Sequence, residues 1–298
     1  MDLSERSELL LETWCKALQT LQIKDMGNPH LDGAILCPSC GKIHGRCFDA
    51  MYPFLHQAQR SSEKSWVASA MALFDWAEET LSLSNGAYLN DIDSEWIGTT
   101  VFSTIQLADC MLHYDHLIPP SYKQRISNRI RKAADFLYDY ESLIWNNVNY
   151  PISNALALYR CGTLFGEERY SEKAKKFAAV AKTVITEHGL IFGEGVPRTR
   201  LSKKGCVSVD IGYNVEETLP ALALYGALSG DEESSQLAKD SLFAHLSFML
   251  EDGGWDNSFG TRNFKWTYWG SRTSDGCLPG YLRSEERRVG KECRSRWS

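Results

Sequence analysis

The densest group of chemically capable side chains lies between Trp255 and Gly276. This glycine-punctuated stretch combines aromatic rings, cations and carboxylates, a mixture that core packing does not explain. Aromatic rings stack on the apolar C–H faces of sugars, and arginine pairs bidentately with a carboxylate such as that of a uronic acid. The stretch therefore predicts an acidic-sugar site, the alternative being a loop whose rings and ions only pack on each other. The expected substrate contacts are Arg262, Lys265, Trp266, Tyr268, Trp269 and Arg272.

A second group, residues 210–217, comes directly before an apolar helical run. Hydrolysis of a glycosidic bond needs two carboxyl groups, one as acid and one as base or nucleophile. The expected carboxyl groups are those of Asp210, Glu216, Glu217, Asp256 and Asp275. A uronate lyase instead uses a tyrosine or histidine as base, with asparagine or arginine stabilising the developing enolate; Tyr213 and Asn214 suit these roles. Similar polar segments occupy residues 146–151 and 90–96, and ordinary helix capping would also explain all three.

A third motif places Cys37, Cys40, His44 and Cys47 within eleven residues. Thiolates and imidazole are the ligands of tetrahedral zinc, so the motif predicts a structural zinc ion, although the spacing is tight. Reduced thiols packed beneath the loop are the alternative. We expect catalysis itself to need no cofactor. His30, in a loop that contains glycine and proline, is a further candidate for a substrate contact.

The elements that carry these groups are predicted to be helices. Apolar residues recur at helical spacing, whereas the alternating pattern of strands is nearly absent. Proline and glycine fall between the periodic runs, where helix ends are expected. The predicted helices cover Leu9–Leu21, Trp66–Leu81, Thr100–His113, Tyr122–Tyr138, Ile152–Phe165, Ser171–Ile185, Glu217–Leu228 and Ser234–Leu250.

An internal repeat of about 64 to 66 residues refines this prediction. The sequence ALALY at 155–159 recurs at 221–225, and a glycine–acidic turn follows each copy, at 166–168 and 230–232. Each unit has an apolar helix, a turn, an amphipathic helix and a glycine-rich loop. Such hairpins stack into a ring with buried inner and half-exposed outer helices. We therefore predict an all-α fold, an α/α toroid that is incomplete in this chain.

Composition excludes several classes of function. The 298 residues carry a formal net charge of −6, which gives no basic field for nucleic acid or an anionic membrane. The first residues are charged, so neither a secretory signal nor a membrane span is predicted, and the nine cysteines suggest a reducing compartment; both favour a cytoplasmic protein. Residues 283–298, nine of them charged, do not continue the periodicity. We interpret 1–282 as the toroid domain and 283–298 as a non-native, disordered tail.

The hairpins, the cysteine loop, the DIGYNVEE segment at 210–217 and the KWTYWGSRTSDG segment at 265–276 together resemble α/α-toroid carbohydrate-active enzymes. The resemblance spans about residues 25–282 and is greatest to heparinase II/III-like proteins and exo-β-glucuronidase-type glycoside hydrolases. It implies a toroid, often followed by a β-rich domain, and activity on uronic-acid-containing glycans. From it we expect a hydrolase that releases terminal glucuronic acid. A heparinase-type polysaccharide lyase and a non-catalytic glycan-binding module are the alternatives.

Overall fold

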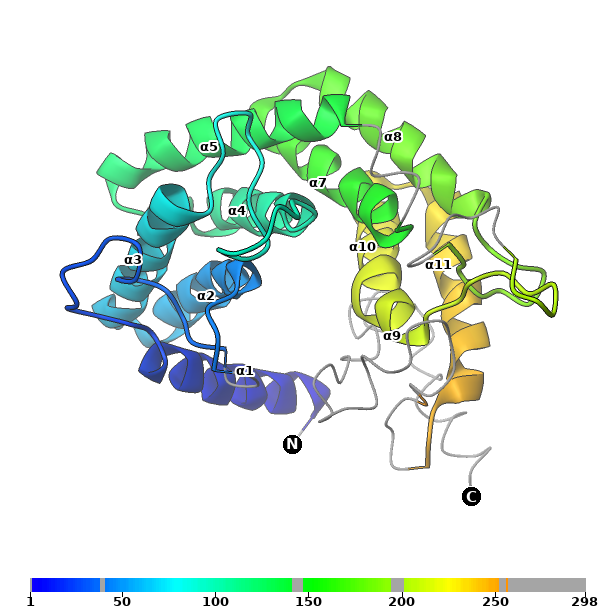
Figure 1. Ribbon diagram of the computed structural model, residues 1–298, viewed down its shortest axis with the longest axis horizontal. Helices are drawn as coiled ribbons and strands as arrows, with labels where there is room; N and C mark the ends of the chain where they lie inside the picture. Colours follow the sequence, from blue (N-terminus) through cyan, green and yellow to red (C-terminus); the bar gives the residue numbers. More distant parts are fainter. Residues whose placement is uncertain (1, 38–40, 141–146, 194–200, 252–255, 257–298) are drawn as a thin grey trace. The chain divides into compact units, whose positions relative to one another are not determined.

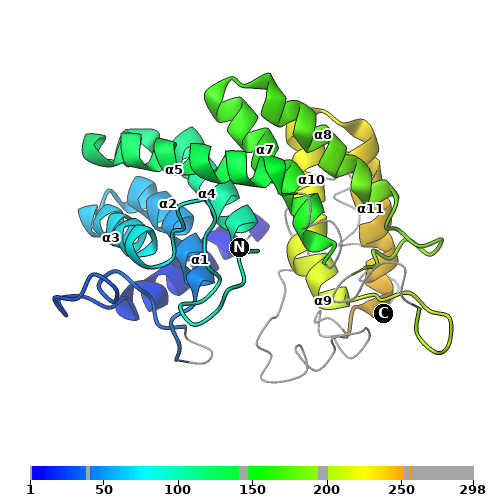
Figure 2. The ribbon, with the colours of Figure 1, turned by 45° about the horizontal axis from the view of Figure 1, so that its top comes forward.

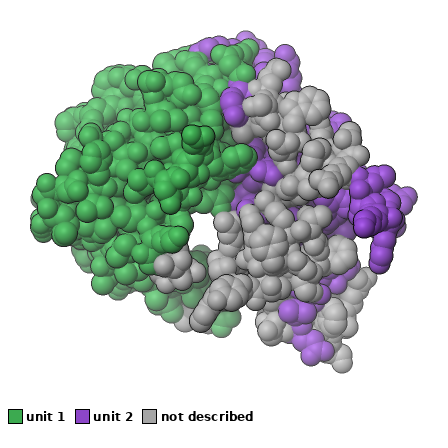
Figure 3. Space-filling model, viewed as in Figure 1, with its two compact units in different colours: residues 1–139, 160–167 green, residues 140–159, 168–298 purple. Residues whose placement is uncertain are grey.

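The computed structural model describes residues 2–37, 41–140, 147–193, 201–251 and 256. Over these residues the chain forms helices joined by loops, and its β-type pairing is limited to isolated bridges such as Gln22↔Ile35 and Ile185↔Ile191. The all-α prediction is therefore confirmed for this part of the chain. The chain divides into two compact units, coloured separately in Figure 3. Unit 1 comprises residues 1–139 and 160–167, and unit 2 comprises residues 140–159 and 168–298.

Unit 1 is a series of antiparallel helices joined by short turns and two longer loops (Figure 1). Its elements are α1 (Leu3–Thr20), η1 (Gly45–Ala50), α2 (Met51–Ser61), α3 (Lys64–Thr80), α4 (Thr100–Tyr114), η2 (Asp115–Leu117) and α5 (Pro120–Asp139). Helix α1 begins six residues before the predicted start because Asp2 caps it. The Asp2 carboxylate accepts a hydrogen bond from the Glu5 amide (2.8 Å), and the Glu5 side chain accepts one from the Asp2 amide (3.0 Å).

Helix α2 was not predicted from the sequence. It is only 11 residues long and has Pro53 in its first turn. Proline is tolerated there because the first amides of a helix have no partner within the helix. The segment is amphipathic and buries Met51, Phe54 and Leu55, so packing against α3 and α4 stabilises a helix that its length alone would leave marginal.

Unit 2 contains the second sequence repeat and the first one apart from residues 160–167. Its elements are α7 (Asn149–Phe165, of which residues 160–165 are grouped with unit 1), α8 (Glu168–Lys182), α9 (Ile211–Tyr213), η3 (Asn214–Thr218), α10 (Leu219–Ser229), α11 (Glu232–His245) and η4 (Leu246–Phe248). Helices α9, η3 and α10 follow one another without a break, and η3 is a π-helical turn. Figure 2 shows α10 beside α11 and α7 beside α8, as the hairpin pattern predicts.

The repeat predicted from the sequence is confirmed in three dimensions. The turns after α7 and α10 both contain a glycine in the left-handed region, Gly166 at φ 66° and Gly230 at φ 73°. The equivalent tyrosines, Tyr159 and Tyr225, pack edge to face with their ring centroids 5.8 Å apart, and the Tyr159 hydroxyl donates to the Leu228 carbonyl (2.6 Å). The ALALY segment is buried in α10, whereas α11 keeps an exposed face. Over the described residues, no helix is both long enough and apolar enough to span a membrane.

Candidate functional site

The predicted segment 210–217 forms the start of the α9–η3–α10 helix in unit 2. Asp210 is its N-cap, and the Asp210 carboxylate accepts a hydrogen bond from the Tyr213 amide (3.2 Å). Tyr213 ends α9 and is followed at once by the π-helical turn of η3. Such turns place one extra residue in a helix and often occur at functional sites. The geometry therefore gives Asp210 a capping contact and places Tyr213 at an irregular point of the backbone.

Asn214, the first residue of this turn, is fully buried and holds the turn to its surroundings. Its side-chain amide donates to the Ile191 carbonyl (2.9 Å) and to His245 Nε2 (3.0 Å). His245 Nδ1 lies 2.7 Å from the Ser241 carbonyl, which can only accept, so Nδ1 carries the proton and Nε2 is the acceptor. Burial lowers the pKa of His245 to about 4, so the imidazole is neutral at physiological pH.

Glu217, one turn further along, brings two of the predicted polar segments together. The Asn149 side-chain amide, at the start of α7, donates to Glu217 Oε2, and the Ser153 hydroxyl lies 3.4 Å from the Glu217 carbonyl oxygen. Asn149 and Glu217 are both more than nine-tenths buried. A buried carboxylate is stabilised by such a donor because it has lost its water. Glu216 beside it is half-buried. We call Asn149, Tyr213, Asn214, Glu217 and His245 the unit 2 polar cluster.

The structure describes three of the four predicted zinc ligands, Cys37, His44 and Cys47, and all three belong to unit 1. Cys40 lies outside the described residues. The side chains of Cys37 and Cys47 are both half-buried. His44 Nδ1 lies 2.5 Å from Asp91 Oδ1, so the cysteine loop meets the polar segment at 90–96. A carboxylate behind Nδ1 is the usual partner of a zinc-binding histidine, which would then bind the metal through Nε2. Within the described ranges, however, no three His, Cys, Asp or Glu side chains are grouped closely enough to hold a metal. The zinc ion stays a prediction.

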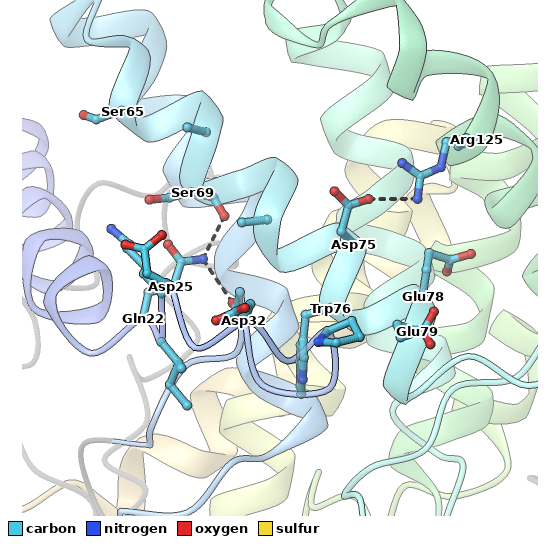
Figure 4. A pocket seen from close by; sticks show the side chains of 17 residues that line it. Gln22, Asp25, Asp32, Ser65, Ser69, Asp75, Trp76, Glu78, Glu79 and Arg125 are labelled. Carbon is cyan, nitrogen blue, oxygen red and sulfur yellow. Dashed lines mark hydrogen bonds and ion pairs between the residues drawn. The ribbon is translucent and has the colours of Figure 1, made fainter.

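An open cleft of about 1130 Å³ lies between α3 and the loop after α1 in unit 1 (Figure 4). Its lining carries five carboxylates, those of Asp25, Asp32, Asp75, Glu78 and Glu79, against the cations of Lys24 and Arg125. Several of these carboxylates already have partners: Asp75 pairs with Arg125 (2.8 Å), and Asp32 accepts from the Met26 amide (2.8 Å). The negative charge of the lining disfavours a polyanionic sugar. We therefore do not assign the substrate to this cleft.

His30 lies in the same loop after α1. Its side chain is exposed, with Nδ1 3.5 Å from the Thr80 hydroxyl, and its backbone carbonyl accepts from Trp76 Nε1 (3.1 Å). The backbone of His30 thus anchors the loop to α3. A substrate contact by its imidazole stays a prediction.

The remaining predicted site residues can be placed only in part. The Asp256 amide donates to the Phe248 carbonyl (2.7 Å), and its side chain is half-exposed. The other residues of the aromatic stretch fall outside the described residues, as does the tail 283–298. These site residues are Arg262, Lys265, Trp266, Tyr268, Trp269, Arg272 and Asp275.

Comparison with known proteins gives the family. The model of the ulvan lyase N-terminal domain matches residues 11–288 of the chain. This chain belongs to that family. A broad-specificity ulvan lyase of Formosa agariphila is 40% identical over 278 residues, which cover 92% of this chain and 43% of that protein. The chain thus spans less than half the length of the curated relative that it matches.

Two solved structures show the fold. Cellobiose 2-epimerase from Bacillus thermoamylovorans matches with a TM-score of 0.53 and 13% identity, covering 71% of this chain and 62% of that one. The α-1,6-mannanase GH76A of Salegentibacter, in complex with α-1,6-mannotetrose, matches with a TM-score of 0.52 and 14% identity, covering 85% of this chain and 74% of that one. The predicted α/α-toroid class is confirmed. At such low identity the likeness concerns the fold alone.

The prediction of a glycoside hydrolase is wrong. The family and the 40% identical relative are both lyases, which favours the alternative drawn from the sequence. The error has a chemical reason, since the carboxylates, rings and arginines that bind an acidic sugar serve hydrolysis and elimination equally well. The resemblance to toroid carbohydrate-active enzymes is confirmed, but the family is the ulvan lyase N-terminal domain. His245 was not predicted as a site residue, because in the sequence it is a lone histidine among the apolar residues of a helix.

Proposed function

We propose that this chain is the toroid portion of a polysaccharide lyase that cleaves ulvan. The observation that carries the proposal is the 40% identity, over 278 residues, to a broad-specificity ulvan lyase. The family match over residues 11–288 supports it, because it includes both the unit 2 polar cluster and the aromatic stretch. The uronic acid inferred from the arginines and aromatic rings supplies the acidic carbon–hydrogen bond that a lyase needs.

Elimination at a uronic acid moves one proton off a carbon and one onto an oxygen. A base removes the proton from the carbon beside the carboxylate, and the freed electron pair forms a double bond to the neighbouring carbon. The bond from that neighbour to the glycosidic oxygen breaks, and the oxygen takes a proton. Tyr213 is our candidate for the proton transfer, since a tyrosine can act both as base and as acid. Arg262 and Arg272 are proposed to pair with the sugar carboxylate.

The unit 2 polar cluster is proposed to fix the position of Tyr213. Both amide hydrogens of Asn214 are used by Ile191 and His245, so Asn214 is suited to hold the π-helical turn and less suited to contact sugar. The contact between Asn149 and Glu217 ties the next turn to α7. We therefore assign Asn214 a positioning role and keep the reaction at Tyr213.

The proposal is tested by incubating the protein with ulvan and following ultraviolet absorbance from the new double bond, which is conjugated to the carboxylate. Tyr213→Phe is expected to lower the rate by about 10²- to 10⁴-fold, the usual contribution of one acid–base group. Tyr122→Phe is the matched control, because Tyr122 lies in α5 and binds Asp75 (2.5 Å). It should keep the full rate.

Binding of ulvan without any absorbance change would contradict the lyase proposal and support the alternative of a glycan-binding module. Absorbance that develops equally with the Tyr213→Phe protein would leave the lyase in place but overturn the role of Tyr213. Thermal unfolding of both variants shows whether a lost rate reflects a lost fold.

A further inference from the structure

Unit 1 contains a second group of rings and titratable side chains, separate from the acidic cleft and the cysteine loop. It is built from three helices, α1, α2 and α4, with Arg160 of the segment 160–167 added. We call it the unit 1 ring cluster, and its members are Glu8, Tyr52, His56, Arg60, Asp109, His113, Tyr114 and Arg160. Helices α2 and α4 pack side by side, so these residues share one region of the unit (Figure 1).

Three rings form the centre of the unit 1 ring cluster. The three rings form a triangle: the Tyr52 centroid lies 5.2 Å from that of Tyr114 and 6.4 Å from that of His113, and the Tyr114 and His113 centroids lie 6.3 Å apart. The His113 side chain is 44% exposed, and Tyr52 is half-buried. Burial and the nearby Arg160 charge lower the pKa of His113, so its ring is neutral at physiological pH. Two neutral rings that reach solvent are thus held side by side, with Tyr114 buried behind them.

Hydrogen bonds and an ion pair surround Tyr114, the buried ring of this group. His56 Nδ1 lies 2.8 Å from the Tyr114 hydroxyl, and His56 Nε2 lies 3.1 Å from Glu8 Oε2. A carboxylate accepts, so Nε2 carries the proton and Nδ1 accepts from Tyr114. Arg60 pairs with the same Glu8 carboxylate (2.6 Å). Tyr114, against which the Tyr52 and His113 rings pack, is therefore held in place before any ligand arrives, which reduces the entropy that binding would cost.

The charged side chains beside His113, those of Arg160 and Asp109, have opposite charges and form an ion pair. Arg160 Nε lies 2.7 Å from Asp109 Oδ1, and an Arg160 nitrogen lies 3.5 Å from His113 Nε2. Each carboxylate of the cluster thus faces a guanidinium, in contrast to the acidic cleft with its five carboxylates and two cations. A sugar chain that carries carboxylates meets no net repulsion here, and hydroxyl groups find both donors and acceptors.

We propose that the half-buried ring of Tyr52 and the exposed ring of His113 are a binding subsite for a pyranose of the substrate glycan, with Asp109 and Arg160 facing its hydroxyl groups. Flat neutral rings beside a carboxylate and a guanidinium match a sugar, which has an apolar C–H face and a rim of hydroxyls. The choice of a glycan rests on the proposed function. The subsite binds and does not react: burial raises the pKa of the Tyr52 phenol, which stays protonated and is a poor base.

The experiment measures binding of an ulvan oligosaccharide directly, by calorimetry, alongside the lyase assay. Tyr52→Leu and His113→Ala each remove one ring of the subsite, and each is expected to weaken binding about three- to tenfold. In the lyase assay the same variants should raise KM with kcat unchanged, because the subsite holds the sugar equally in the ground and transition states. Tyr122→Phe is the control and should bind as the unchanged protein does.

The outcomes separate the subsite from the lyase. Unchanged binding by both Tyr52→Leu and His113→Ala overturns the subsite, whether or not the protein cleaves ulvan. Weakened binding without any cleavage by the unchanged protein supports the subsite and contradicts the lyase proposal. A fall in kcat at constant KM would show that the rings act in the reaction and overturn a pure binding role. His113→Ala keeps the test valid if Tyr52→Leu unfolds, because the His113 side chain is 44% exposed.

Discussion

At the scale of single residues, the unit 2 polar cluster depends on one neutral imidazole. His245 Nε2 accepts the hydrogen bond from Asn214, and this bond holds the first residue of the π-helical turn. A protonated His245 could not accept it, and its charge would be buried without a carboxylate partner among the residues bonded to it. The position of Tyr213 is thus linked to the protonation state of a side chain 32 residues further along the chain.

We predict that His245 makes the protein acid-labile. Its pKa is lowered from 6.5 to about 4 in the folded protein, so between these values the unfolded chain binds more protons. Stability from this group is complete above about pH 6.5 and falls as the pH drops towards about 4, by roughly 3 kcal/mol in total. Urea unfolding of the protein and of His245→Gln across this range measures the effect. The difference between the two proteins in how steeply the free energy of unfolding changes with pH gives the contribution of His245. Equal slopes would contradict the prediction.

A second prediction at this scale concerns the cysteine loop. If zinc is bound, protein washed with a weak chelator should retain about one zinc ion per chain, and Cys37→Ser should retain markedly less, since a thiolate ligand is lost. Cys206→Ser is the matched control, because Cys206 is an exposed free thiol of unit 2. Elemental analysis gives the answer. Metal-free protein whose melting temperature equals that of zinc-supplied protein would refute a structural ion.

The sequence located part of the unit 2 polar cluster and missed the rest for a physical reason. Residues 210–217 are contiguous, so their composition alone indicated a site. Asn149 meets Glu217 across 68 positions of sequence, and His245 meets Asn214 across 31. Such pairs depend on how the helices pack. In the sequence, Asn149 was one of several polar residues in a segment, and His245 was a lone histidine.

At the scale of elements, periodicity predicted most helices to within a few residues. The errors follow from local chemistry: the Asp2 cap extends α1 at its start, and η4 with a following turn ends the last predicted helix before Leu250. Helix α2 was not predicted because it is short and has a proline in its first turn, both of which weaken the helical pattern in the sequence. Its packing against other helices stabilises it nevertheless. Loops were harder to predict, since their shape depends on contacts with helices distant in sequence.

Gly33, in the loop after α1, lies against Ala72 of α3 and gives a third prediction. It has φ 98°, and a Cβ there would lie 2.1 Å from the Ala72 carbonyl oxygen of α3. Gly33→Ala must therefore push the loop off α3, and we expect a loss of about 2–4 kcal/mol in the free energy of unfolding. Gly27→Ala is the control: Gly27 is also left-handed (φ 68°), but the space around it is open. It should cost about 1 kcal/mol. Equal losses in urea unfolding would mean that the close approach costs nothing.

At the scale of the whole molecule, the repeat predicted the fold class correctly, whereas the reaction was assigned wrongly. A 64- to 66-residue unit with one apolar and one amphipathic helix has few ways to bury its apolar faces, so the toroid follows from packing. The choice between hydrolysis and elimination depends instead on which group stands next to one carbon or one oxygen of the bound sugar. The arrangements that favour hydrolysis and elimination differ only in the positions of a few atoms around the bound sugar, and this difference leaves no pattern in the composition of the sequence or in the spacing of its residues.

The last prediction concerns the tail, residues 283–298, which we interpret as foreign to the fold. Its removal should change the free energy of unfolding by less than about 0.5 kcal/mol and leave cleavage of ulvan unchanged, the usual effect of a change outside the packed fold. The family model matches as far as residue 288, so a second truncation that retains 283–288 separates the two parts of the tail. Removal of residues 257–298 is the contrasting variant. It deletes the predicted arginine and aromatic contacts, and ulvan binding should be lost. If the protein that lacks only residues 289–298 already melts at a lower temperature than the full chain, the boundary at 282 is wrong and the family's domain extends into the tail.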